Sequence, residues 1–190
     1  MKIGITGHTK GIGKTLFESL CDEKREIFGY SRSNGWDITK DIKRIYEDAR
    51  EHDLFINNAQ SQYYQAQLHS YFYREGYEGR MISIGSMGSE YNLQFKNHPY
   101  AIQKVALAET NSQLYMMGYN VSLINLAYVD TENTRQMAER MKHGALHMAQ
   151  ARMRYSAINP AKPLPQSTVY DLVQFILDFP YRVKSITVST

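Results

Sequence analysis

Residues 6–13, Thr6-Gly7-His8-Thr9-Lys10-Gly11-Ile12-Gly13, are the stretch of sequence that decides the fold. The stretch follows directly on the apolar run Lys2 to Thr6, and a helical spacing of apolar residues begins within it at Ile12. Glycine lets a chain turn sharply and approach a phosphate closely, while a helix N-terminus offers free N–H groups and the positive end of its dipole. A strand, a glycine-rich loop and a helix in this order therefore predict a site for the pyrophosphate of a dinucleotide.

Short apolar runs alternate with helical patterns along the rest of the chain. Strands are expected at Lys2 to Thr6, Glu26 to Tyr30, Asp53 to Asn57, Arg80 to Gly85, Val121 to Leu126 and Val183 to Val188. Between them, apolar residues at helical spacing predict helices around Ile12 to Leu20, Ile42 to Ala49, Leu68 to Phe72, Val105 to Leu114 and Val169 to Ile176. This alternation predicts a three-layer α/β/α Rossmann fold with a doubly wound parallel sheet, whose ligand crevice lies at the C-terminal ends of the strands.

Size and composition limit what else the chain can contain. Its 190 residues, 43% of them hydrophobic, suffice for one substantial core, so we expect a single dinucleotide-binding domain over residues 1–190. The net charge is only +3 and the basic residues are scattered, which argues against a nucleic-acid partner. A single cysteine, Cys21, and an N-terminal apolar run that ends at Thr6 predict a cytoplasmic protein without a membrane segment.

Three further motifs follow the glycine-rich loop in order. Asn57-Asn58-Ala59 ends the third expected strand, Ile82-Ser83-Ile84-Gly85-Ser86 ends the fourth, and Tyr100-Ala101-Ile102-Gln103-Lys104 begins a helix after His98-Pro99. With 15 tyrosines in the chain, about one Tyr-x-x-x-Lys pair is expected by chance. The pair is therefore informative because of its position, at the start of a helix after the other motifs. The four motifs together resemble the short-chain dehydrogenase/reductase family, over nearly the whole chain from Lys2 to about Val188.

The resemblance implies hydride transfer between NADPH and a small carbonyl or alcohol substrate. The catalytic group it implies is Ser86, Tyr100 and Lys104, and the alignment selects Ser86 over Ser83. The phenol would exchange the proton, the serine would hydrogen-bond the developing oxyanion, and the lysine would also bind the nicotinamide ribose. A phenol with a pKa of about 10 is a poor acid or base at neutral pH, and we expect the ammonium of Lys104, one helical turn away, to lower that pKa.

The charge after the second expected strand favours NADP over NAD. An acid usually pairs with the ribose hydroxyl of NAD there, whereas this chain has Ser31-Arg32-Ser33, with Lys10 in the first loop. By resemblance, Asp37 contacts the adenine amine and Thr131 the nicotinamide end. The complete set of expected cofactor-binding residues is Gly7, Thr9, Lys10, Gly11, Ile12, Gly13, Ser31, Arg32, Asp37, Asn58, Ala59, Tyr100, Lys104 and Thr131.

The chain departs from the family pattern at several positions. Gln60 replaces the glycine of the Asn-Asn-Ala-Gly motif, and Leu126 and Ala127 stand where Pro-Gly is usual. The crossover from Gln60 to Arg80 is short and contains no Asn, so a role that the family often gives to asparagine falls to another residue of the Leu68 to Glu75 helix. These departures support a second hypothesis, a catalytically impaired NADP-binding sensor or scaffold. A flavodoxin-like mononucleotide-binding protein is disfavoured, because the first loop has the dinucleotide pattern.

The region after Thr131 carries the remaining expectations. The substrate-loop region, around residues 132–166, is reduced, and it includes a helix from Thr134 to Arg154 and a proline-interrupted stretch from Asn159 to Gln166. His143 and His147 have metal-ligand spacing but no third ligand nearby, so we expect no metal site. By resemblance, the chain forms a homodimer or homotetramer through the helix of residues 100–117.

Overall fold

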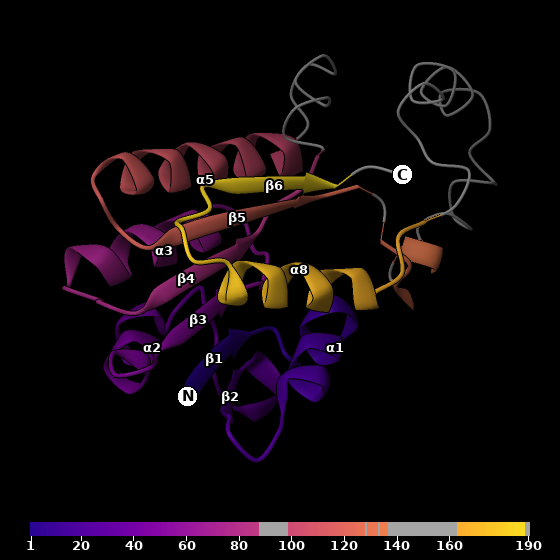
Figure 1. The fold of residues 1–190 in the computed structure, drawn as a ribbon, viewed down its shortest axis with the longest axis horizontal. Helices are drawn as coiled ribbons and strands as arrows, with labels where there is room; N and C mark the ends of the chain where they lie inside the picture. Colours follow the sequence, from indigo (N-terminus) through magenta and orange to yellow (C-terminus); the bar gives the residue numbers. More distant parts are fainter. Residues whose placement is uncertain (88–98, 128, 133, 137–162, 189–190) are drawn as a thin grey trace.

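The computed structural model describes residues 1–87, 99–127, 129–132, 134–136 and 163–188 (Figure 1). In chain order the elements are β1 (Lys2–Thr6), α1 (Gly11–Leu20), β2 (Glu26–Tyr30), the short 3-10 helix η1 (Arg32–Asn34), α2 (Ile42–Ala49), β3 (Leu54–Asn57), α3 (Tyr64–Arg74), β4 (Arg80–Ile84), α5 (Pro99–Met116), β5 (Val121–Leu126), α8 (Ser167–Asp178) and β6 (Ser185–Val188). All six expected strands are present, with ends within two residues of the expected positions.

The six strands form one parallel sheet in the order β2-β1-β3-β4-β5-β6. The chain moves outward from β1 to β2, then returns to the other side of β1 with β3, so the order reverses between β1 and β3. In open α/β sheets, ligands bind at such a reversal, outside the C-terminal ends of the strands. The prediction of a doubly wound sheet is confirmed, although only one described strand lies beyond β1, where the common order 3-2-1-4-5-6 places two.

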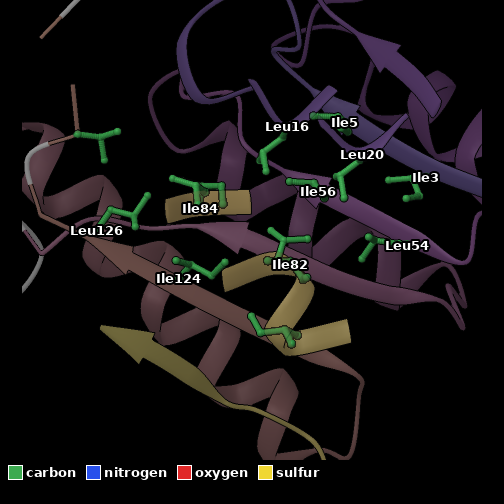
Figure 2. Packing of buried hydrophobic residues seen from close by; sticks show 14 of the residues in the cluster. Ile3, Ile5, Leu16, Leu20, Leu54, Ile56, Ile82, Ile84, Ile124 and Leu126 are labelled. Carbon is green, nitrogen blue, oxygen red and sulfur yellow. The ribbon is translucent and has the colours of Figure 1, made fainter. Parts of the chain in front are cut away.

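One face of the sheet is covered by α1 and α8, which pack side by side (Figure 1). Figure 2 shows the isoleucines and leucines of this core, with alternate residues of each central strand pointing toward the two helices. Within β1, for example, Ile3 and Ile5 point toward them and are fully buried. Burying a side chain of this size stabilises the fold by about 1.5–3 kcal/mol, so this layer holds the ends of β1 and β3 rigidly.

The opposite face is covered by α2, α3 and α5 and is richer in aromatic residues. Phe55 of β3 lies with its ring centroid 4.5 Å from that of Phe72 on α3, and Leu107 of α5 packs near Leu123 of β5. Helices therefore lie on both faces, and the predicted three-layer α/β/α architecture is confirmed.

The helix α5 differs from expectation in the face that it buries. The apolar spacing of Val105, Ala108 and Leu114 predicted a buried face, but all three are only partly buried. The residues buried on this helix are Ala101, Lys104, Leu107 and Asn111. Two of these four are polar, so a pattern that seeks apolar residues misses them, although the predicted Ala108 and Leu114 do pack against the core.

Several expectations fall on parts of the chain outside the described residues. His143, His147 and most of the expected helix Thr134 to Arg154 lie there, so the single domain and the reduced region around residues 132–166 stay predictions. Within the described residues, no group of three His, Cys, Asp or Glu side chains could hold a metal ion. No described helix combines the length and the apolar character needed to span a bilayer.

Candidate active site

The ends of β1 and β3 are joined by Thr6, the last residue of β1. Its side chain is fully buried, and its hydroxyl accepts hydrogen bonds from the backbone N–H groups of Asn58 and Ala59, both at 2.9 Å. The side-chain amide of Asn58 in turn donates to the carbonyl oxygen of Thr6 at 3.0 Å. Asn58 and Ala59, both expected near the cofactor, therefore support the first loop from beneath, at the reversal of strand order.

The glycine-rich loop is folded tightly against this support. Gly7 has φ +70°, in the left-handed region that favours glycine. A Cβ atom on Gly13 would lie 2.2 Å from the carbonyl oxygen of Gly7 and 2.6 Å from the side-chain nitrogen of Asn58, so any larger residue would displace the loop. The close approach of the chain to itself thus requires glycine at both positions.

The loop leads into the N-terminus of α1, which begins at Gly11. No acidic residue lies in the first turn, and Thr9 and Lys10 before it are exposed. The side chain of Ile12 packs against the core that α1 and α8 cover. Its backbone N–H lies in the first turn of α1, where N–H groups have no partner within the helix. The N–H groups of a helix N-terminus, the helix dipole and a nearby lysine fit a bound pyrophosphate.

Thr131 lies beside this loop although it is distant in sequence. A Cβ atom on Gly11 would lie 3.6 Å from the Cγ2 of Thr131, and only 7% of Thr131 is exposed. The backbone N–H of Thr131 donates to the Thr134 hydroxyl at 2.8 Å, which fixes the turn after β5. The structure therefore brings the expected pyrophosphate and nicotinamide ends of the site together.

The end of β2 lies next to the same loop, since the N–H of Gly7 donates to the carbonyl oxygen of Tyr30 at 2.7 Å. Beyond Tyr30, the N–H of Ser31 donates to the side-chain oxygen of Asn34 at 2.9 Å, which closes the turn of η1. Arg32, the first residue of η1, is exposed. A hydroxyl and an exposed guanidinium thus follow β2 at the position expected for the 2′-phosphate of NADP.

Asp37 follows in the next turn. The N–H and the hydroxyl of Thr39 both donate to its Oδ1 at 2.9 Å, and these bonds hold the pKa of the carboxyl below its ordinary value. The positive charges of Arg32 and Lys40 lower that pKa further. The carboxylate is therefore anionic at neutral pH and lies near Arg32, as a residue at the adenosine end should.

The ends of β4 and α5 bring Ser86 and Tyr100 together. Ser86 follows β4, Tyr100 lies in the first turn of α5, and a side-chain hydrogen bond joins them. Ser83 lies elsewhere: it is fully buried, and its hydroxyl is 3.3 Å from the Nδ1 of His69 in the core. Ser86 rather than Ser83 is thus the serine beside the phenol.

Lys104 lies one helical turn beyond Tyr100, with its Nζ 5.7 Å from the centroid of the tyrosine ring. Only 4% of Lys104 is exposed, whereas 38% of Tyr100 is exposed. The ammonium donates hydrogen bonds to the Oε1 of Gln65 at 2.8 Å and to the carbonyl oxygen of Ile84 at 2.9 Å. Burial lowers the pKa of Lys104 to about 7, well below the ordinary value of a lysine.

The expected effect of Lys104 on the phenol is not present in this arrangement. Burial raises the pKa of Tyr100, and it is the hydrogen bond with Ser86, not the lysine, that acts to lower it. The reason is geometric and electrostatic, because the ammonium points toward Gln65 and Ile84 and is itself desolvated. The neighbourhood of the two side chains was predicted correctly, but its electrostatic consequence was not.

Gln65, on the first turn of α3, is the residue that sequence reasoning missed. We expected a contributor from Leu68 to Glu75, but α3 begins at Tyr64, and its first turn supplies the contact with Lys104. A signal was present, because the residues at helical spacing on the buried face of α3 are Gln65, Leu68, His69, Phe72 and Tyr73. A glutamine in line with leucine and phenylalanine indicates a buried amide that needs partners.

The departures from the family pattern also have positions in the structure. Gln60 donates through its side chain to the Oε1 of Gln103 at 2.7 Å, which links the turn after β3 to α5. Leu126 is buried and accepts a hydrogen bond from the N–H of Met87, and Ala127 donates to the carbonyl oxygen of Val188. These residues help to connect β3, β4, β5 and β6 near the C-terminal ends of the strands.

The fold is similar to that of several solved dehydrogenases. A small-chain dehydrogenase in complex with NADPH is 19% identical, with 99% of this chain and 96% of that chain covered and a TM-score of 0.74. The L-sorbose reductase of Gluconobacter frateurii, complexed with NADPH and L-sorbose, is 16% identical, with 98% and 94% covered and a TM-score of 0.74. The 3-alpha-hydroxysteroid dehydrogenase of Pseudomonas sp. B-0831, complexed with NADH, is 14% identical, with 99% and 95% covered and a TM-score of 0.67.

No family model and no curated protein matches the sequence. The likeness to solved structures nevertheless extends over nearly the whole chain, and it establishes the fold. The chain has the α/β fold of the short-chain dehydrogenases, as the sequence resemblance predicted. The described order β2-β1-β3-β4-β5 is also that of flavodoxin-like proteins, so strand order alone does not separate the chain from the flavodoxin-like alternative.

Proposed function

We propose that this chain is a short-chain dehydrogenase/reductase that transfers hydride between NADPH and a small carbonyl or alcohol substrate. The observation that carries the proposal is the group formed by Ser86, Tyr100 and Lys104. The serine is hydrogen-bonded to the phenol, and the lysine lies 5.7 Å from the phenol ring. This group lies at the C-terminal ends of the strands, where the glycine-rich loop and Thr131 also meet.

Each side chain of the group has a task that its chemistry permits. NADPH, when bound, supplies the hydride. In the reductive direction, Tyr100 donates its proton to the carbonyl oxygen of the substrate, and Ser86 hydrogen-bonds the developing oxyanion. Lys104 binds the nicotinamide ribose, and the hydrogen bond with Ser86 favours the phenolate that remains. The partial exposure of Tyr100 suits a group that must reach a substrate.

The preference for NADP over NAD rests on charge. Arg32 and Lys10 are exposed cations on two loops that the bond between Gly7 and Tyr30 holds together. Ser31 adds a hydroxyl beside Arg32, and no acid follows β2 directly, where NAD-binding proteins usually carry one. Two of the similar structures contain NADPH and one contains NADH, so the residues of this chain are the stronger support.

Two further properties belong to the same proposal. The protein forms a homodimer or homotetramer through α5, whose outer side carries the exposed Ile102. It works in the cytoplasm, where a reducing environment keeps an exposed, unpaired cysteine such as Cys21 as a thiol.

A second candidate is an NADP-binding sensor or scaffold without catalysis. The observations that favour it are Gln60, Leu126 and Ala127, which replace the usual residues around the crevice. The reductase and the sensor both require dinucleotide binding, so only a measurement of catalytic turnover distinguishes them.

The test combines dinucleotide titration with turnover. NADPH and NADH are titrated by fluorescence, and aldehydes, ketones and quinones are then screened for NADPH oxidation. Tyr100→Phe should lower kcat about 10²-fold or more while NADPH affinity changes little, because the phenol donates a proton only in the reaction. Tyr115→Phe on the same helix is the matched control, since its hydroxyl bonds only the carbonyl of Arg182 among the described contacts. Binding without any turnover would establish the sensor, and a fully active Tyr100→Phe would reject the proton donor.

A further inference from the structure

Gln65 is buried at the back of the group formed by Ser86, Tyr100 and Lys104. Only 2% of it is exposed, and its side chain has three hydrogen bonds. The Nε2 donates to the carbonyl oxygens of Asn57 at 2.7 Å and Ile84 at 3.1 Å, and the Oε1 accepts from Lys104 at 2.8 Å. One side chain therefore connects the ends of β3 and β4 to the lysine on α5.

These contacts permit one orientation of the amide. The two carbonyl oxygens are acceptors only, so they require the NH2 end of Gln65, and the ammonium is a donor only, so it requires the oxygen. The backbone is held as well, because the side chain of Asn57 donates to the carbonyl oxygen of Gln65 at 2.8 Å. The contacts of Gln65 with β3 and β4 thus orient its amide oxygen toward Lys104, independently of the lysine itself.

The ammonium depends strongly on this oxygen. Lys104 is nearly fully buried, and among the described residues no carboxylate pairs with it. The titratable groups near the network are Tyr100 on α5 and His69 on α3, and burial keeps His69 neutral by lowering its pKa to about 3. An ammonium taken out of water needs charge-assisted hydrogen bonds, and only Gln65 and the Ile84 carbonyl are described as supplying them.

We propose that Gln65 is the positioning residue for Lys104, and that its amide oxygen holds the ammonium in charged form at the wall of the crevice. The importance of this contact for catalysis rests on the proposed function, whereas the contact between Gln65 and Lys104 is seen in the structure itself. Gln65 acts through the lysine and touches neither substrate nor dinucleotide.

The first test measures the protonation of Lys104 directly, without turnover. Protein labelled with 13C at lysine Cε is titrated by NMR, and the signal of Lys104 is assigned as the one missing in Lys104→Met. Gln65→Met keeps the length of the side chain but offers no oxygen, so the titration of Lys104 should move to lower pH by about one pH unit. Gln67→Met, on the exposed side of the same helix, should leave it in place.

A second variant reverses the sign. Gln65→Glu places a carboxylate against the ammonium and should move the Lys104 titration to higher pH, since an opposite charge favours the charged form. In an active enzyme, the high-pH limb of kcat should move in the same two directions. A purely structural role would lower activity in both variants without moving either titration. If Gln65→Met does not fold, Gln65→Asn takes its place, because it is one methylene too short to reach both Lys104 and the strand carbonyls.

The outcomes separate this inference from the proposed function. A Lys104 titration that is the same in wild type, Gln65→Met and Gln65→Glu would overturn the inference, even in an active reductase. Opposite shifts in a protein that oxidises no NADPH would support the inference and reject the reductase.

Discussion

At the scale of the residue, the proposed preference for NADP over NAD assigns the 2′-phosphate to Arg32. Replacing it with Ala removes the exposed guanidinium at the start of η1, which the 2′-phosphate would contact. One charge-assisted hydrogen-bond pair is worth about 1.5–3 kcal/mol, so Arg32→Ala should weaken NADPH binding about 10- to 100-fold. NADH, which has no 2′-phosphate, should bind as before.

Fluorescence titration of both dinucleotides checks this prediction. Lys43→Ala is the matched control, since Lys43 is exposed on α2 and lies 3.8 Å from Glu47 rather than in the crevice. An unchanged NADPH affinity in Arg32→Ala would mean that the phosphate binds elsewhere.

The candidate site illustrates which residues a sequence can reveal. The proximity of Ser86, Tyr100 and Lys104 could be predicted because strand ends and one helical turn determine their spacing. Gln65 could not be paired with Lys104 in this way, because the contact depends on how α3 and α5 pack against β4. The pKa of Tyr100 was also beyond reach, since it depends on burial and on the direction of the ammonium, neither of which appears in a motif.

At the scale of the element, α5 carries exposed apolar side chains on its outer side, beside the exposed Glu109 and Gln113. Leu107 is fully buried, whereas 40% of Ile102 and 76% of Met116 are exposed. If this outer side forms the oligomer interface, Ile102→Lys should convert the oligomer to monomers with little change in unfolding free energy. Leu107→Ala, which removes core atoms, should instead reduce the unfolding free energy by about 2–5 kcal/mol.

Light scattering for mass and denaturant unfolding for stability distinguish the two variants. A wild-type monomer at micromolar concentration, or an Ile102→Lys protein of wild-type mass, would contradict an interface on α5.

The elements also differ in how well their sequences predict them. The buried parallel strands were predicted almost to the residue, because short continuous apolar runs such as Leu54 to Ile56 are typical of strands that are buried on both faces. The buried face of α5 was not, because Lys104 and Asn111 lie on it. The order of the strands was also open, since local patterns do not reveal how many strands lie beyond β1.

At the scale of the whole molecule, the buried ionisable groups share a preference for the neutral form. Burial lowers the pKa of His69 to about 3 and that of Lys104 to about 7, and it raises the pKa of Tyr30, Tyr73 and Tyr77. In the unfolded chain these groups have ordinary pKa values, near 6.5 for His, 10.4 for Lys and 10 for Tyr. Folding therefore changes proton binding on both sides of neutral pH.

The sign of the effect follows from which state binds more protons. Between pH 3 and 6.5 at His69, and between pH 7 and about 10 at Lys104, the unfolded chain binds the extra proton, so stability rises with pH. Above about pH 10 the tyrosines ionise first in the unfolded chain, so stability falls. The free energy of unfolding should therefore be greatest between about pH 8 and 10.

Urea unfolding of the protein without added dinucleotide, from pH 5 to 10.5, tests this expectation. His69 alone should contribute a loss of about 2 kcal/mol between pH 6.5 and 5, and Lys104 a gain of about 2 kcal/mol between pH 7 and 9. His69→Gln should flatten only the acid side of the curve and Lys104→Met only the alkaline side, so each variant is the control for the other. Curves parallel to the wild type in both variants would show that these two groups titrate in the folded protein much as they do in water, and would contradict the lowered pKa values that burial gives them.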